Sequence, residues 1–287
     1  MGSGTLAALA AIIVLGVPHG ALDGEIARPL TRPRAGRFWF LAFAVPYLAL
    51  AAAVLLTWRA APVVTLLGFL AISVSHFGTE DAPGASWLAT LVRGAAPIAL
   101  PLLAQPIATL RVLSVIACAP APEWLVGLAW VWAVAGALFV WRHASRAETV
   151  ELAGIAALSI ALPPLVAFAL YFVGLHARRH TAALIASRLA PRVTNWSTAM
   201  RHATPVTALT IAIGGLLWPF YPGAAPDRLL MLTIQGLAAL TVPHMALDHL
   251  AQAAALGSRN TSRAPMTCPP SSRRFSAIRL PRKATAI

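Results

Sequence analysis

Residues 38–57 read FWFLAFAVPYLALAAAVLLT, a continuous apolar run without a charged side chain. About 20 such residues are needed for an α-helix to cross the hydrocarbon core of a bilayer. Comparable runs recur between charged or Pro/Gly-rich breaks, at residues 5–22, 62–79, 87–104, 123–142, 149–180, 203–220 and 228–250. A shorter run, 107–119, is interrupted by Arg111 and is expected to be re-entrant or interfacial. The pattern predicts an all-α fold, a polytopic transmembrane helical bundle of about 8–9 membrane segments.

The composition excludes a soluble globular enzyme. Hydrophobic residues make up 59% of the 287 residues, charged residues only 11%, and the mean hydropathy is +0.74. A typical soluble domain is about a quarter charged. A core of this size cannot hide so much apolar surface from water, so the chain is expected to be embedded in a lipid bilayer.

Basic residues outnumber acidic residues by 22 to 9. We interpret this excess as basic residues that keep their loops on the cytoplasmic side, according to the positive-inside rule, and that contact anionic lipid headgroups. No nucleic-acid-binding motif is present, so no nucleic-acid partner is expected. The first apolar segment lacks the basic region that opens a signal peptide and is expected to be a retained helix. Cys118 and Cys268 lie far apart and form neither a metal-binding pair nor a disulfide framework.

Two parts of the chain differ in composition. Residues 1–256 contain all the apolar runs and are expected to form an integral membrane domain that carries the chemistry. From Gly257 onward the sequence is rich in Ser, Pro and Arg and shows no periodicity. Residues 257–287 are therefore expected to be a disordered basic C-terminal tail that the chemistry does not need.

The run 149–180 is long for one tilted helix and short for two. Pro163 and Pro164 lie in its middle. Proline inside a helix removes a backbone hydrogen bond and clashes with the preceding turn. Two consecutive prolines therefore predict a helix that is broken at Pro163-Pro164 into two short segments.

The chain contains an internal repeat. Residues 17–23 read VPHGALD and residues 242–248 read VPHMALD, and they differ only at Gly20 and Met245. Each copy closes an apolar segment. Chance similarity between Ala- and Leu-rich helices is the alternative explanation, although Pro, His and Asp are scarce residues to match by accident.

Ionisable side chains at membrane depth are costly, which makes them candidates for function. Of the eight histidines, five sit at the C-terminal ends of apolar segments: His19, His76, His176, His180 and His244. Neutral imidazole is the commonest nitrogen ligand of Zn, Fe, Cu and Ni, so convergence of these histidines would suggest a metal site. The other three are expected at a solvated interface (His143, His202) or on a different helix face from His244 (His249).

The pair His176 and His180 in YFVGLHARRH has a spacing that puts both rings on one helical face. This spacing suits two adjacent coordination positions. The alternative is an amphipathic helix end that faces headgroups, which Arg178 and Arg179 would support.

Two aspartates repeat this spacing, because Asp23 lies four residues after His19 and Asp248 lies four residues after His244. Each aspartate can therefore face its histidine on one side of a helix. Metal-bound imidazoles usually donate their other N–H to a carboxylate or carbonyl, a supporting position that both aspartates fit. An aspartate that caps the next segment or meets an arginine at the interface is an equally good account.

Four motifs within residues 5–250 together resemble the Brp/Blh family: GVPHGALD, SHFG, YFVGLHARRH and TVPHMALDH. The resemblance implies a membrane β-carotene 15,15'-dioxygenase that uses Fe(II) and O₂ to cleave the central double bond of β-carotene into two molecules of all-trans-retinal. It places the iron ligands, as the catalytic residues, on His19, His76, His176 and His180. His244 matches a further motif and is expected to support the ligands or to contact the substrate. The basic tail matches no motif of the family.

The aromatic residues Phe77, Tyr171 and Phe172 adjoin the histidine motifs and are candidates for an apolar slot that binds the polyene. Aromatic residues in membrane helices are more often packing residues, which is the alternative for all three. The polyene would supply the reducing equivalents, and the chain contains no flavin or nicotinamide motif. A retinal-binding rhodopsin is a candidate acceptor of the product.

Two other functions compete with this interpretation. A membrane di-iron desaturase or hydroxylase acting on lipid also uses histidine-rich helix ends, but generally in HxxxH and HxxHH boxes. This chain has one HxxxH and no HxxHH. A non-catalytic carotenoid or retinal carrier is the second alternative, since internal repeats and broken helices also occur in transporters.

A single metal site constrains the topology. His19 and His76 end the first and third segments and so lie on one side of the membrane, and His176 joins them only if the chain crosses an even number of times in between. The break at Pro163-Pro164 meets this requirement. The arginine-rich stretches 23–37 and 178–202 then share one side with the tail. By the positive-inside rule we expect a multi-pass protein of the cell inner (plasma) membrane with its metal site towards the cytoplasmic face.

Overall fold

The computed structural model describes residues 2–187 and 189–262, with side chains described through residue 255. Within these residues every regular element is a helix, which confirms the predicted all-α class. The elements are α1 (Ser3–Ala11), η1 (Ile12–Gly16), η2 (Val17–Leu22), α2 (Asp23–Ala35), η3 (Gly36–Phe38), α3 (Trp39–Ala60), α4 (Pro62–Asp81), α5 (Trp87–Ala104), α6 (Pro106–Ala117), α7 (Trp124–Arg142), α8 (Arg146–Ala161), α9 (Pro164–Tyr171), η4 (Phe172–Ala177), α10 (Arg178–Ala186), α11 (Trp196–Leu217), η5 (Trp218–Phe220) and α12 (Ala225–Ser262).

Several stretches of helix are built to cross a membrane. In the described part of the chain, six are long and apolar enough: Ser3–Ala60, Pro62–Asp81, Trp87–Ala104, Trp124–Arg142, Trp196–Phe220 and Ala225–Ala255. The first contains a chain reversal at Gly36, whose φ of 53° ends α2. The 16-residue α8 and the α9–η4–α10 segment are not among the six, so the count of 8–9 segments stays a prediction.

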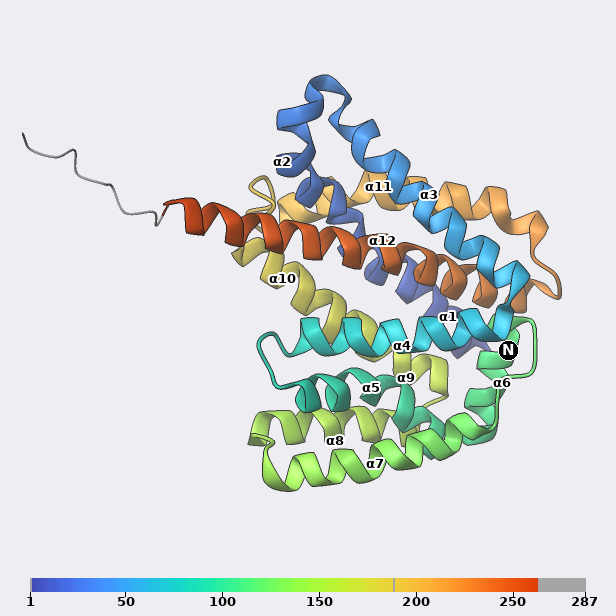
Figure 1. The fold of residues 1–287 in the computed structure, drawn as a ribbon. Coiled ribbons are helices and arrows are strands. Elements are labelled where there is room, and N and C mark those ends of the chain that lie inside the picture. The colour runs from blue at the N-terminus through green and yellow to red at the C-terminus, as the bar shows by residue number, and fades with distance from the viewer. Residues whose placement is uncertain (1, 188, 263–287) are drawn as a thin grey trace, which may run out of the picture.

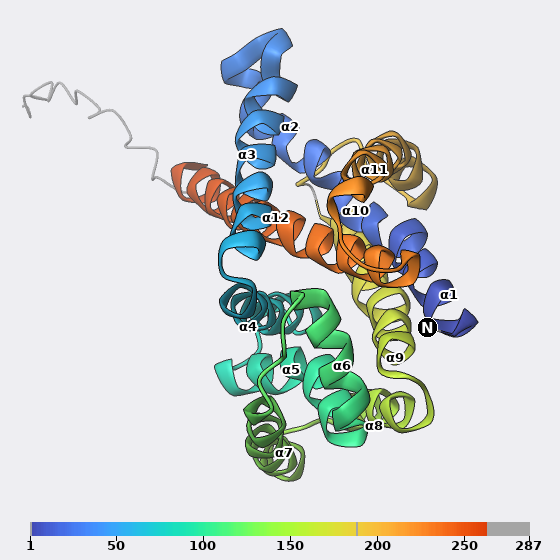
Figure 2. The ribbon, with the colours of Figure 1, turned by 90° about the vertical axis from the view of Figure 1, so that its right-hand side faces the viewer.

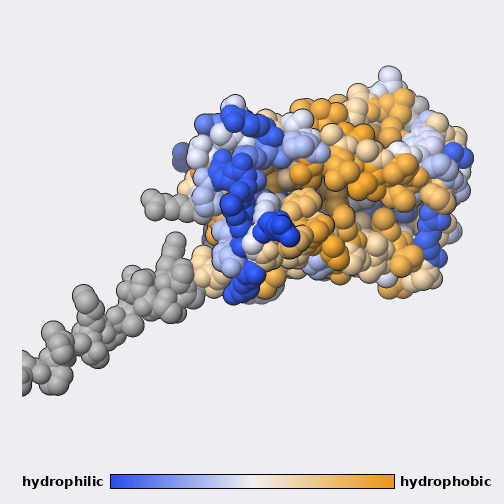
Figure 3. All heavy atoms as spheres, turned by 90° about the horizontal axis from the view of Figure 1, so that it is seen from above, coloured by the Kyte–Doolittle hydropathy of each residue, from blue (hydrophilic) through white to orange (hydrophobic). Residues whose placement is uncertain are grey.

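Large apolar side chains point outward from these helices. Val64 is 70% exposed, Val131 67% and Leu216 75%. On the face shown in Figure 3, apolar residues form a broad belt and hydrophilic residues gather mainly at one end. A contiguous apolar surface of this extent marks a membrane-facing region.

The helix break predicted at Pro163-Pro164 is confirmed. α8 ends at Ala161, Leu162 is extended, and α9 begins at Pro164. The side-chain amide of Gln105, between α5 and α6, donates to the carbonyl oxygens of Ser159 at 2.7 Å and Leu162 at 2.6 Å. Carbonyl groups at the interrupted helix end are thereby paired inside the bundle. After the break the chain turns back, so α8 and the α9–η4–α10 segment run in opposite senses across the molecule (Figure 1).

Close packing of α4 on α5 fixes one wall of the interior. The backbone of Gly78 lies against the carbonyl of Thr90, and Gly94 lies against the carbonyl of Val74, so closely that a Cβ at either glycine would clash with backbone. Small residues allow such close approach between membrane helices. The contact holds the C-terminal end of α4, which carries His76.

The ends of the molecule differ in their elements. α2, α10 and the C-terminal end of α12 lie at one end, and α6 and the N-terminus lie at the other (Figure 1). α3 and α11 flank α12 (Figure 2). α12 continues to Ser262, so the first residues of the expected C-terminal tail are helical. Residues 263–287 of that tail lie outside the described residues.

Candidate metal centre

Two departures from α-helical geometry position His19. η1 is a π-helix and η2 is a 3-10 helix, and His19 lies in the second. π-helical turns are frequent at functional sites. Gly16, at the end of η1, packs against the ring of Phe172 so closely that a Cβ would clash. The Nδ1–H of His19 donates to the carbonyl oxygen of Gly16 at 2.5 Å, which leaves Nε2 of His19 available as a ligand.

His76 and His176 meet across the bundle. His76 lies near the end of α4, and His176 lies in η4, the second π-helix. Their Nε2 atoms are 3.2 Å apart. Asp81 supports this arrangement, because one carboxylate oxygen lies 3.3 Å from Nδ1 of His176 and the other accepts the hydroxyl of Tyr171 at 2.5 Å. The carboxylate thus holds the ring with Nε2 directed at His76.

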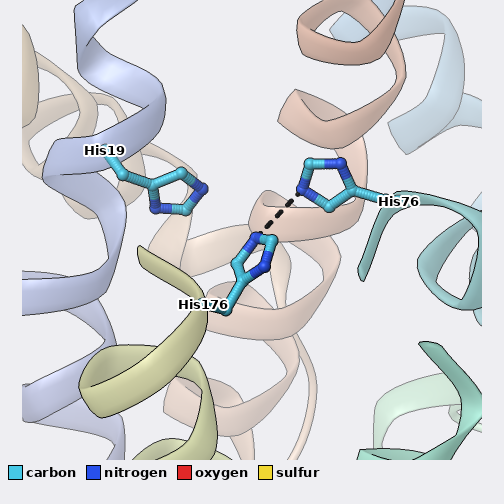
Figure 4. Close-up of side chains that lie close together, drawn as sticks. All are labelled: His19, His76 and His176. Atoms are coloured by element: carbon cyan, nitrogen blue, oxygen red, sulfur yellow. Dashed lines mark hydrogen bonds between the residues drawn. The ribbon is translucent and has the colours of Figure 1, made fainter. Parts of the chain in front are cut away.

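Three buried histidines therefore form a compact donor group. His19, His76 and His176 each offer one ring nitrogen, and these atoms lie within 4.8 Å of one another. Figure 4 shows the three rings turned toward one another from three separate elements. Imidazole donors at this separation suit a divalent transition metal such as Fe, Zn, Cu or Ni.

A second donor group adjoins the first. Glu80, His180, His244 and Asp248 each offer one ligand atom, again within 4.8 Å of one another. Nδ1 of His180 lies 2.6 Å from a carboxylate oxygen of Glu80, and Nδ1 of His244 lies 2.7 Å from a carboxylate oxygen of Asp23. The Nε2 atoms of both histidines are buried and have no hydrogen-bond partner.

The two groups form one cluster. The ring centroid of His19 lies 5.4 Å from that of His176, 5.4 Å from that of His180 and 5.9 Å from that of His244. The ring of His76 lies 4.9 Å from that of His176 and 5.3 Å from that of His244. The five histidines at segment ends thus converge, as the metal interpretation requires.

Some details differ from the sequence-based expectations. His176 and His180, which were expected to offer adjacent ligands from one face, fall in neighbouring donor groups, and the set of four histidine ligands stays a prediction. Asp23 was expected to face His19, but its carboxylate accepts from His244 and from the hydroxyl of Tyr47, at 2.7 Å each. Asp248 does face its own histidine, with an oxygen 3.5 Å from Nε2 of His244.

The three remaining histidines lie outside the cluster. His143 ends α7 and is exposed, His249 is exposed, and His202 lies 3.5 Å from Glu25. These positions agree with the expectation that none of them belongs to the metal site.

Three residues of the site were missed at the sequence level: Glu80, Asp81 and Tyr47. Glu80 lies four residues after His76, the spacing that drew attention to Asp23 and Asp248, so the same criterion could have found it. Tyr47 lies in an apolar run far along the chain from its partner Asp23, and no local pattern marks it.

An apolar cavity leads outward from the cluster. His19, His76 and His244 form part of its wall, together with aromatic residues of which Phe77 and Phe172 were expected. Tyr171 is not among the lining residues and contacts Asp81 instead. The space measures about 1100 Å³ when its open mouth is included.

The cavity opens on the apolar flank of the molecule. Leu48 of α3 and Leu209 of α11 line it and are about half exposed. These two helices flank α12, which carries His244 (Figure 2). A molecule dissolved in the bilayer can therefore reach the histidines between α3 and α11 without passing through water.

Comparison with known proteins adds to this geometry. The sequence profile of the family described as beta-carotene 15,15'-dioxygenase matches residues 10–251. The chain is 31% identical over 253 residues to the "Beta-carotene 15,15'-dioxygenase" of uncultured marine bacterium 66A03, covering 84% of this chain and 91% of that protein. It is 29% identical over 287 residues to the "Probable beta-carotene 15,15'-dioxygenase Blh" of Halobacterium salinarum, covering 83% and 81%. No solved structure matches the chain significantly.

The apolar helices and the buried histidine–carboxylate cluster define the class, which is a helical membrane protein with a candidate metal centre. The matches then identify the family within that class. The chain belongs to the β-carotene 15,15'-dioxygenase family.

Proposed function

We propose that this chain cleaves β-carotene with O₂ at its central 15,15' double bond and releases two molecules of all-trans-retinal. The relatives that it matches bear the name of this activity. The observation that carries the proposal is the apolar cavity that joins the histidine cluster to the lipid-facing flank. A C40 hydrocarbon dissolved in the bilayer is the kind of substrate that such a cavity accepts.

The residues present fit Fe(II). Neutral imidazole suits iron, and a ligand histidine usually donates its second N–H to a carboxylate or carbonyl. Two of the three histidines in the first group have such a partner, the Gly16 carbonyl for His19 and the Asp81 carboxylate for His176. His19, His76 and His176 would hold the metal, with His180 beside them as the predicted fourth ligand. When bound, iron supplies the reaction with O₂ that side chains alone cannot perform.

The chain's own residues bind and orient the substrate. Phe77 and Phe172 line the cavity together with the histidines, with ring centroids 6.4 Å apart, and would contact the polyene. The ring of Phe172 stacks on that of His176, with centroids 5.6 Å apart. The apolar wall also excludes water from the cluster, which strengthens every electrostatic interaction within it.

The charge distribution supports a proposal for the location of the protein in the cell. Arginines of α2 and α10 lie at one end of the molecule, whereas α6 with Arg111 lies at the other (Figure 1). By the positive-inside rule, we place the first end and the metal centre towards the cytoplasmic face of the plasma membrane. A reporter fused after Leu256 is expected to be active only in the cytoplasm, and activity only in the periplasm would reverse this orientation. Retinal released into the bilayer would be available to a retinal-binding rhodopsin.

Expression in a β-carotene-producing bacterium tests the proposal. Extracted pigment should lose β-carotene and gain retinal in cells with the wild-type chain, and should be unchanged in cells with His76→Ala. The matched control is His143→Ala, because His143 is exposed and outside the cluster. Unchanged carotenoid with no aldehyde product in wild-type cells would contradict the proposal.

The same preparations separate the two alternatives. A carrier would bind carotenoid without consuming O₂, and a lipid desaturase or hydroxylase would need an external reductase. Oxygen uptake by the purified protein on addition of β-carotene, with no reductase present, is expected only of the proposed reaction.

A further inference from the structure

The second donor group has the composition of a metal site in its own right. Nε2 of His244 lies 3.7 Å from a carboxylate oxygen of Glu80 and 3.5 Å from a carboxylate oxygen of Asp248. The other oxygen of Glu80 lies 2.6 Å from Nδ1 of His180. Two carboxylates and two imidazoles therefore converge from α4, α10 and α12.

Two buried ring nitrogens that lack a hydrogen-bond partner point to a missing ligand. Nε2 of His180 and Nε2 of His244 are buried without a hydrogen-bond partner. The two side chains are only 10% and 4% exposed. A buried polar atom left unpaired costs on the order of 1–3 kcal/mol, so native structures rarely leave such atoms without a partner or an ion.

The charge of the whole cluster leads to the same conclusion. Four carboxylates surround the five histidines: Asp23, Glu80, Asp81 and Asp248. Within the described residues, each hydrogen-bond or ion-pair partner of these carboxylates is a histidine or a tyrosine, and none is an arginine. Buried carboxylates require compensation, and divalent cations held among the histidines would supply it.

We propose that Glu80, His180, His244 and Asp248 bind a second divalent transition-metal cation beside the cation of the three-histidine group. The mixed nitrogen and oxygen donors suit Fe(II), Mn(II), Co(II) or Zn(II). Glu80 lies between the positions proposed for the two cations. Its oxygen that approaches His244 is also 3.6 Å from Nδ1 of His76, a residue of the three-histidine group. This assignment moves His180 from the first cation to the second.

Metal stoichiometry tests the proposal without reference to activity. The full-length chain in detergent is stripped of metal, titrated anaerobically with Co(II), freed of unbound metal and analysed by elemental mass spectrometry. About two cations per wild-type chain are expected, and about one in Asp248→Asn and in Glu80→Gln, because the second group loses a charged ligand. The matched control is Asp227→Asn at the opposite end of α12, which should retain about two.

Two results would overturn the proposal. One is a single cation per wild-type chain, in which case protonated histidines rather than a metal balance the carboxylates. The other is a pair of cations that Asp248→Asn and Glu80→Gln both leave in place. Because the wild-type value needs no variant, a variant that misfolds does not weaken the test.

The test of the second metal site can fail or succeed independently of the test of β-carotene cleavage. Wild-type protein that forms retinal with one cation per chain would refute the second site and leave the proposed function intact. Protein that binds about two cations but forms no retinal would support the second site and contradict the proposed function.

Discussion

The two copies of the VPHxALD repeat differ only at Gly20 and Met245, yet they fold differently. In the first copy Val17–Leu22 form a 3-10 helix after a π-helix and Asp23 begins α2, whereas the second copy lies within the continuous α-helix α12. Residues four apart share a face in an α-helix but not in a 3-10 helix, which has three residues per turn. Accordingly, Asp248 faces His244 in the second copy, whereas Asp23 turns away from His19 in the first.

A hydrogen bond between Asp23 and His244 links the two copies of the repeat. Asp23 of the first copy accepts from His244 of the second, and His19 donates to a backbone carbonyl instead. His19 thereby belongs to the three-histidine group and His244 to the mixed group. The two copies of one motif therefore supply their histidines to different donor groups, and they differ in helix type.

The largest expected effect is the difference in retinal formation between His19→Ala and His244→Ala. His19→Ala should reduce retinal formation by more than the roughly 100-fold typical of a lost supporting residue, because it removes a ligand of the redox metal. His244→Ala should reduce it less and should remove mainly the second cation. Retinal formation and metal content of the purified variants measure both effects. Near-normal turnover and metal content in His19→Ala would contradict the assignment of His19 as a ligand of the redox metal.

Gly16→Ala tests whether the π-helix of the first copy positions His19. The added Cβ would meet the ring of Phe172, and overpacking of this kind costs typically about 1–3 kcal/mol. We expect a lower midpoint of thermal unfolding in detergent and a loss of metal from the three-histidine group. Gly20→Ala is the matched control, because a Cβ at Gly20 meets nothing within 4 Å. Equal behaviour of the two variants would show that the close contact is unimportant.

Asp23→Asn tests the link between the copies. It removes the carboxylate that holds Nδ1 of His244, and loss of such a support typically lowers metal affinity or activity about 10–100-fold. Because Asp23 acts through His244, its effect on retinal formation should largely disappear when His244→Ala is already present. Additive effects in the double variant would contradict the observed pairing.

Gly20→Met makes the first copy identical to the second and should have the smallest effect. Gly20 lines the cavity, so the longer side chain would occupy space meant for the substrate. We expect unchanged metal content and a reduction in retinal formation of about tenfold, the low end for a changed apolar pocket contact. Loss of metal in this variant would show that Gly20 itself sets the helix type of the first copy.

Features set by local chemistry could be predicted from the sequence. The apolar runs predicted the helical class, and the two adjacent prolines predicted the break between α8 and α9 because each proline removes a helical hydrogen bond. The five histidines at segment ends were predicted to converge, since ionisable side chains at membrane depth need partners.

Features set by tertiary packing could not be predicted. Gly16, which ends the π-helix at Ile12–Gly16, packs against Phe172, and Phe172 lies far along the chain. The i,i+4 spacing of an α-helix paired Asp23 with His19, but His19 lies in a 3-10 helix, and the partner of Asp23 in the structure is His244. The pairing of Tyr47 with Asp23 likewise exists only once α3 packs beside α2 and α12.

The central claim is that the histidine cluster cleaves β-carotene at its middle, and product analysis of the purified chain tests it most directly. The protein in detergent, loaded with Fe(II), is given β-carotene and air, and the products are quantified by chromatography. The account predicts about two molecules of retinal per β-carotene consumed, with O₂ taken up and no reductase added. Aldehydes longer or shorter than retinal, or retinal formed equally well by His19→Ala, would contradict it.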